Sequence, residues 1–87
     1  MRKQYTSIFK EFFYKKLIYS RSELGISQEE MAERSEMAVR SYIDLDHGKT
    51  SCSAVTLVLY LIYVCDEPQA FLDELKAEFE TCKTKAA

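Results

Sequence analysis

Glycine, proline and histidine are scarce in this chain of 87 residues, which contains two glycines, one proline and one histidine. An all-β domain needs many turns built from glycine and proline, so their scarcity argues against a β fold. One histidine and three cysteines without a C-x-x-C pair argue against a four-ligand zinc site. We therefore expect no metal, no cofactor and no intrachain disulfide, and free thiols in a reducing cytosol at Cys52, Cys65 and Cys82.

Long hydrophobic runs are also missing. Charged residues at positions 10, 11, 15 and 16 interrupt the N-terminal region, which therefore lacks the apolar segment of a signal peptide. The apolar-rich run Ala54–Cys65 is too short to span a bilayer as a helix, and it predicts a buried helix instead. We expect a cytoplasmic protein without a membrane partner.

The chain does have enough apolar sequence for one core. A composition of 47% hydrophobic and 30% charged residues excludes an intrinsically disordered chain, and the length predicts a single domain, residues 1–87. The charge is uneven. Residues 1–24 carry six Lys/Arg and two acids, a net +4, whereas residues 25–50 and 51–87 each carry three Lys/Arg and six acids, a net −3.

Apolar residues recur at three- and four-residue steps along the whole chain, which predicts an all-α domain of five helices. The first helix is long and aromatic and forms an N-terminal extension, with Thr6 or Ser7 as its cap and Gly25 at its end. Ser27 begins a capping box with the glutamate three residues later, so a second helix is expected to begin at Gln28.

The second half of the chain predicts three further helices. A third helix is expected over about Val39–Asp46, and a fourth from a cap at Ser51 or Ser53 through Cys65. A fifth begins near Pro68, and the tail from about residue 82 is expected to be frayed. The inward positions of these helices predict a core of Phe12, Leu17, Met31, Ala32, Met37, Tyr42, Leu45, Leu57, Leu61 and Phe71.

Two short helices joined by a tight turn are typical of a helix-turn-helix, which is expected at about residues 28–47. One glycine stop precedes the first of these helices, and another follows the second. Residues 24–34, LGISQEEMAER, resemble the opening of the phage Cro/repressor (Xre-type) helix-turn-helix family, and DHGK at 46–49 falls at the matching distance downstream. The resemblance covers about Leu17–Leu75. It implies a compact five-helix, repressor-like domain that binds DNA.

The resemblance also assigns roles to particular residues. It implies that Gln28 donates to a phosphate, and that Arg40 grips guanine O6 and N7 through two N–H groups. It further implies an ion pair between Arg21 and Asp46 that sets the angle of the third helix. The residues implied to contact DNA are Gln28, Val39, Arg40, Ser41, Asp44 and Lys49.

This sequence departs from the family pattern at several positions. Glu36 stands where the turn usually has glycine, Ser35 replaces an aliphatic residue, and Ala38 replaces the usual Ser or Thr cap. Because residues 25–50 are acidic, a DNA-binding face needs positive charge from the first helix. The first helix can supply that charge only if Lys15, Lys16 and Arg21 lie on the DNA side.

Two functions are compatible with these observations. The first is a sequence-specific transcriptional regulator that binds a palindromic site as a homodimer. The second is a protein-interaction module on the same fold, such as an antitoxin or anti-regulator, which does not bind DNA. The aromatic first helix and the face from Phe71 to Phe79 either form the dimer contact or pack on each other. We expect no enzyme activity, because a phosphate loop, a pair of carboxylates and a His/Cys dyad are all missing.

Overall fold

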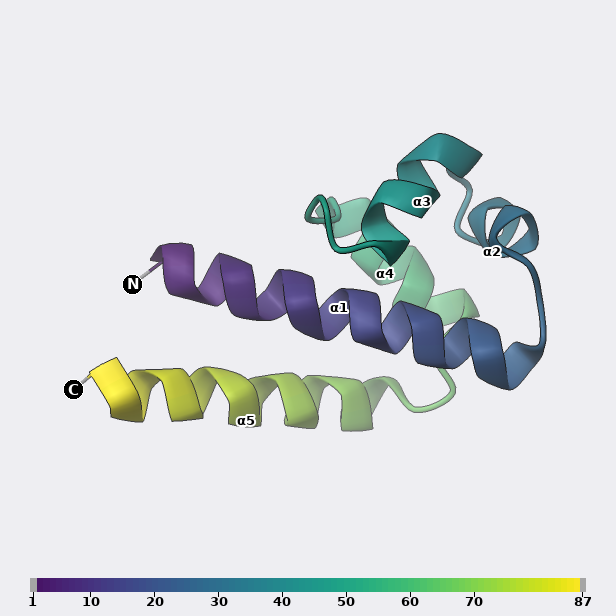
Figure 1. Ribbon diagram of the computed structural model, residues 1–87. Coiled ribbons are helices and arrows are strands. Elements are labelled where there is room, and N and C mark those ends of the chain that lie inside the picture. Colours follow the sequence, from purple (N-terminus) through teal and green to yellow (C-terminus); the bar gives the residue numbers. More distant parts are fainter. Residues whose placement is uncertain (1, 87) are drawn as a thin grey trace.

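The computed structural model describes residues 2–86 and is all-α (Figure 1). The predicted fold class, a five-helix domain, is confirmed, and residues 2–86 contain no strand. The helices are α1 (Arg2–Leu24), α2 (Gln28–Arg34), α3 (Val39–Asp46), α4 (Ala54–Tyr63) and α5 (Pro68–Ala86).

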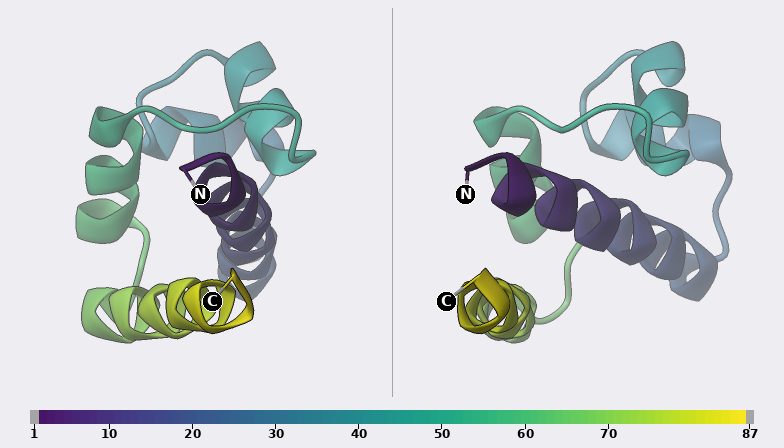
Figure 2. Two further views of the ribbon diagram at one scale, coloured as in Figure 1. Left: turned by 90° about the vertical axis from the view of Figure 1, so that its left-hand side faces the viewer. Right: turned by 60° about the vertical axis from the view of Figure 1, so that its left-hand side comes forward.

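The helices α1 and α5 run in opposite directions and pack against each other, and Figure 2 shows that their axes cross (Figures 1 and 2). The longest dimension of the molecule is 42 Å. The shorter helices α2, α3 and α4 gather on the other side of α1. The segment 47–53 leaves α3 and crosses over the N-terminal half of α1 to reach α4 (Figure 2). As a result α1 contacts both α3 and α5 and forms the centre of the domain.

The core lies where the five helices meet, and all the predicted core residues belong to it. Some are buried and the others are half-buried against the buried ones. The prediction missed Phe13, Tyr60, Val64 and Leu75, which are also buried. The rings of Phe13, Tyr60 and Phe71 pack on one another with centroids 5.2–6.3 Å apart. Such aromatic packing explains how a small domain reaches a well-filled core.

Several helix ends lie where the sequence predicts them. Ser27 Oγ accepts a hydrogen bond from the Glu30 backbone N–H at 3.1 Å, and Ser53 Oγ accepts one from Thr56 at 3.2 Å. Both hydroxyls satisfy amide groups that have no partner inside their own helix. Pro68 is the first residue of α5.

Other helix ends were predicted wrongly. Thr6 and Ser7 do not cap α1, because the helix already begins at Arg2. The tail from residue 82 is not frayed, because α5 continues to Ala86. Packing explains both errors: the rings of Tyr5 and Phe79 lie 4.9 Å apart and hold these two helix ends together.

The fourth helix also ends earlier than predicted. It stops at Tyr63 rather than Cys65. The backbone N–H groups of Val64 and Cys65 both donate to the Tyr60 carbonyl, at 3.0 and 2.8 Å. The Cys65 bond spans five residues rather than four, so the last turn is wider than a regular α-helical turn.

Apolar faces that were candidates for a dimer contact are used inside the domain. The aromatic face of α1 packs on the face from Phe71 to Phe79, as the 5.1 Å separation of the Phe12 and Phe71 rings shows. Exposed apolar side chains instead gather on α4, a helix without a charged residue. They are Val55, Val58, Ile62 and Tyr63.

Burial of Tyr60 is expected to make the domain less stable at alkaline pH. Burial raises the pKa of Tyr60 to about 12, and its hydroxyl lies 2.9 Å from Ser20 Oγ. In the unfolded chain tyrosine ionises near pH 10, so between about pH 10 and 12 only the unfolded state loses this proton. We expect the free energy of unfolding to fall across that window. Urea unfolding of wild type and Tyr60→Phe at pH 9 and 11 measures this fall in the free energy of unfolding. An equal fall in both proteins contradicts its assignment to Tyr60.

Candidate nucleic-acid interface

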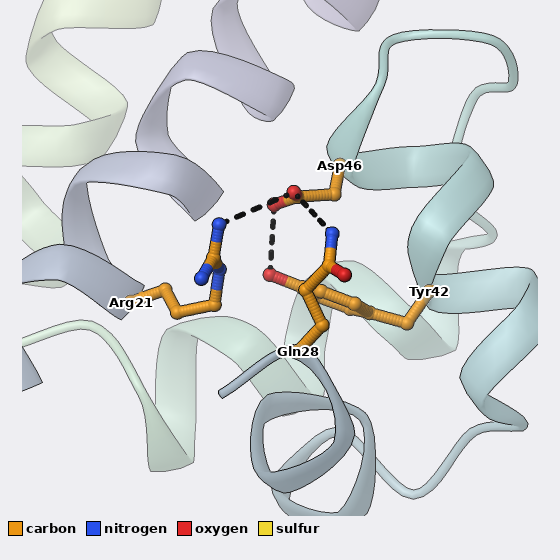
Figure 3. Close-up of polar contacts among 4 residues, drawn as sticks. All are labelled: Arg21, Gln28, Tyr42 and Asp46. Atoms are coloured by element: carbon orange, nitrogen blue, oxygen red, sulfur yellow. Dashed lines mark hydrogen bonds and ion pairs between the residues drawn. The ribbon is translucent and has the colours of Figure 1, made fainter. Parts of the chain in front are cut away.

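A polar cluster joins the first three helices (Figure 3). Its centre is the carboxylate of Asp46, the last residue of α3, which is only 4% exposed. Oδ1 accepts from the Tyr42 hydroxyl at 3.0 Å, while Oδ2 accepts from Gln28 Nε2 at 3.0 Å and from Arg21 Nη2 at 3.5 Å. One carboxylate therefore ties the end of α3 to both α1 and the start of α2.

Burial makes these hydrogen bonds important. A buried carboxylate is costly unless it is paired and hydrogen-bonded, and here three donors surround it. Burial, followed by the charge of Asp46, raises the pKa of Tyr42 well above its ordinary value, so the phenol keeps its proton and remains a donor. The Asp46 carboxylate thus has three hydrogen-bond donors around it.

The sequence pointed to only part of this cluster. The Arg21–Asp46 pair was expected from the resemblance, and the structure places these groups at ion-pair distance, 3.5 Å. The bonds from Tyr42 and Gln28 were missed. A signal for the first was available, because Tyr42 and Asp46 are four residues apart on one face of α3. No such signal exists for Gln28, since its bond depends on how α2 and α3 meet.

The amide of Gln28 has two N–H groups, and Asp46 uses one of them. Its expected contact with a phosphate therefore needs the second N–H group, which the first bond holds in a fixed direction. Gln28 is the first residue of α2, where the backbone N–H groups and the helix dipole favour an anion.

The exposed side of α3 lies opposite its buried side chains. Tyr42, Leu45 and Asp46 face inward, whereas the first turn presents the remaining candidates to solvent. Of the residues predicted to read DNA, Val39, Arg40 and Ser41 are exposed and Asp44 is half-buried. Arg40 forms no ion pair with any described side chain, so its guanidinium is available to a ligand.

The turn before α3 has the geometry that the family pattern would fill with glycine. The backbone N–H of Met37 donates to Ala32 O and that of Glu36 donates to Glu33 O, both at 3.0 Å. This is a Schellman motif, whose left-handed position is usually glycine. Glu36 occupies that position with φ 53°, at a cost of about 1 kcal/mol. Ala38 caps α3 without a side-chain hydrogen bond, as its lack of a polar group predicts.

The chain after α3 is fixed against α1. Gly48 has φ +70°, and a Cβ atom at this position would lie 3.0 Å from a carbon of the Tyr14 ring. Only glycine therefore fits here without displacing the ring. Lys49 follows directly and is exposed, and its backbone N–H donates to Asp44 O at 2.9 Å.

The condition for the cations of α1 is met by only one of the three. Lys16 pairs with Glu74 on α5 and so lies on the side of α1 away from α3. Lys15 pairs with Glu11 on α1 itself at 3.0 Å. Only Arg21 reaches α3, and there it compensates a buried carboxylate. The sequence alone did not show which side of α1 packs on α5.

The three cysteines, Cys52, Cys65 and Cys82, are half-buried and free, and burial raises the pKa of the Cys52 thiol to about 11. Among the described residues no group of three or more His, Cys, Asp or Glu side chains is arranged to hold a metal ion. None of the helices within residues 2–86 combines the length and apolar character needed to cross a bilayer.

Comparison with known proteins adds no assignment. The chain matches no protein-family model, and it has no significant match among curated proteins or solved structures.

Proposed function

We propose that this protein is a sequence-specific DNA-binding transcriptional regulator of the Cro/repressor type, with α2 and α3 as its helix-turn-helix. The observation that carries the proposal is the Asp46 cluster. It fixes the end of α3 to α1 and α2, and it leaves the first turn of α3, with an unpaired Arg40, facing solvent. A recognition helix needs this arrangement, because its N-terminal residues meet the base edges in the major groove.

In the proposed complex Arg40 donates two hydrogen bonds to one guanine, and Val39 meets a thymine methyl group. Asp44 accepts from a cytosine amino group. Gln28, Ser41 and Lys49 contact the sugar–phosphate backbone and fix the position of α3 without reading sequence.

We further propose that two protomers bind a palindromic site, with half-sites about one helical turn apart. The proposal includes a cytoplasmic location and a role in binding rather than in catalysis. Titration of a selected duplex with protein measures the stoichiometry, for which two chains per duplex are expected.

One observation favours the alternative, a protein-interaction module such as an antitoxin or anti-regulator. Four glutamates, at positions 29, 30, 33 and 36, are exposed on α2 and the following turn. They make this side acidic and oppose the approach of phosphates. A duplex of mixed sequence, tested at about 50 mM salt, separates the two functions: a DNA-binding regulator is retained on it, and the interaction module is not.

Asp44→Asn provides a more specific test of the proposed interface. Removing one negative charge next to the phosphates is expected to tighten binding to mixed-sequence duplex DNA several-fold at low salt. Fluorescence anisotropy measures the change. Asp73→Asn, which removes the same charge from α5, is the matched control and is expected to have little effect. Equal effects of the two variants would show that net charge alone acts.

A further inference from the structure

We infer that α1 carries a second DNA-contacting element, a lysine stripe formed by Lys3 and Lys10, which extends the proposed interface toward the N-terminal end of α1. This inference rests on the proposed DNA binding. In the proposed complex these two side chains contact phosphates that α2 and α3 do not reach.

Helix geometry aligns the stripe with the residues of α1 that contact α3 and the segment after it. Lys3 also borders a groove between α1 and α5 that Glu78 lines. With about 3.6 residues per turn, Lys3 and Arg21 are about five whole turns apart and lie in line. Lys10 and Tyr14 fall within about 20° of the same line. Two contacts fix its direction: Arg21 lies 3.5 Å from Asp46 at the end of α3, and the Tyr14 ring lies against Gly48.

The stripe also holds the two lysines of α1 that have no acid partner among the described side chains. Lys3 is exposed and Lys10 is half-buried, and neither forms an ion pair with a described side chain. By contrast, Lys15 and Lys16 are paired with Glu11 and Glu74. Among the described side chains of α1, two lysines have no acid partner. These two lysines lie on one line along the helix.

The position of the stripe continues that of Lys49. The segment 47–53 crosses over α1 (Figure 2), and Gly48 rests on Tyr14, about one turn after Lys10. The distance from α3 therefore increases in the order Lys49, Lys10, Lys3. Residues 25–50, which include α2 and α3, carry a net charge of −3. A face with this charge needs such cations if it is to approach a polyanion.

The test measures binding of the full chain to a 30-bp duplex of mixed sequence from about 50 to 200 mM NaCl. The double variant Lys3→Gln/Lys10→Gln is compared with Lys15→Gln/Lys76→Gln, which removes the same charge from exposed positions off the stripe. None of these lysines lies in the core, and circular dichroism checks that both variants fold.

We expect the stripe variant to reduce the slope of log Kd against log salt by about 2 per protomer, because each phosphate contact contributes about 0.9. The control variant is expected to keep the wild-type slope. Equal slopes in the two variants, with wild type still bound, overturn the inference and leave the proposed function standing. A wild-type protein that is not retained at about 50 mM salt overturns both.

Discussion

Asp46→Ala is expected to lower the free energy of unfolding by about 2–4 kcal/mol, which is a large part of the stability of a small domain. The change removes the acceptor of three hydrogen bonds and leaves the Arg21 guanidinium, the Tyr42 hydroxyl and the Gln28 amide without it. Buried donors that lose their partner retain their desolvation cost. Because Arg21 is 28% exposed, water recovers part of the loss, and the lower half of the range is expected. Urea unfolding followed by circular dichroism measures it.

Two controls separate the cluster from a general effect of charge. Asp46→Asn keeps the shape and one acceptor oxygen, so it is expected to cost less than the alanine variant. Glu33→Ala removes an exposed acid from α2 and is expected to change stability by no more than about 0.5 kcal/mol. If Asp46→Ala behaves like Glu33→Ala, the cluster does not hold the three helices together.

Arg40→Ala is expected to weaken binding to the selected operator duplex by about 1–3 kcal/mol, or roughly 5- to 150-fold in Kd. The reason is the loss of a two-pronged contact with guanine. The same variant is expected to lose its preference at one base pair per half-site, while preferences at the other positions remain. Anisotropy titrations against the selected duplex and its single-base variants measure both effects.

Arg34→Ala is the matched control for this prediction. It removes the same charge from the end of α2, where Arg34 lies 3.9 Å from Glu30. Its effect on affinity is expected to be small and equal for all duplexes. A uniform loss for Arg40→Ala across every single-base variant would show that Arg40 contacts a phosphate instead of a base.

The sequence predicts well those features that depend on neighbouring residues. Ser27 and Ser53 cap helices because a hydroxyl three residues from an unpaired amide is a local arrangement, and Pro68 starts α5 for a similarly local reason. The limits of α1 and α5 were missed because Tyr5 and Phe79 are far apart in the chain and meet only in the folded domain.

The candidate site shows the same division. The exposure of Arg40 follows from the period of α3, since Tyr42 and Leu45 take the inward face. The pairing of Lys16 with Glu74 could not be predicted, because it depends on the side of α1 that α5 covers. The bond from Gln28 to Asp46 likewise depends on the packing of two helices against each other.

The uncharged face of α4 gives the molecule two surfaces with opposite responses to salt. Val55, Val58 and Ile62 expose apolar area, and salts that are excluded from protein surfaces, such as sulfate, favour its burial. The contacts proposed for Arg40, Lys49 and the lysine stripe weaken as salt rises, because counterions return to the phosphates. A rising sulfate concentration therefore weakens the proposed contacts with DNA and favours burial of the apolar face of α4.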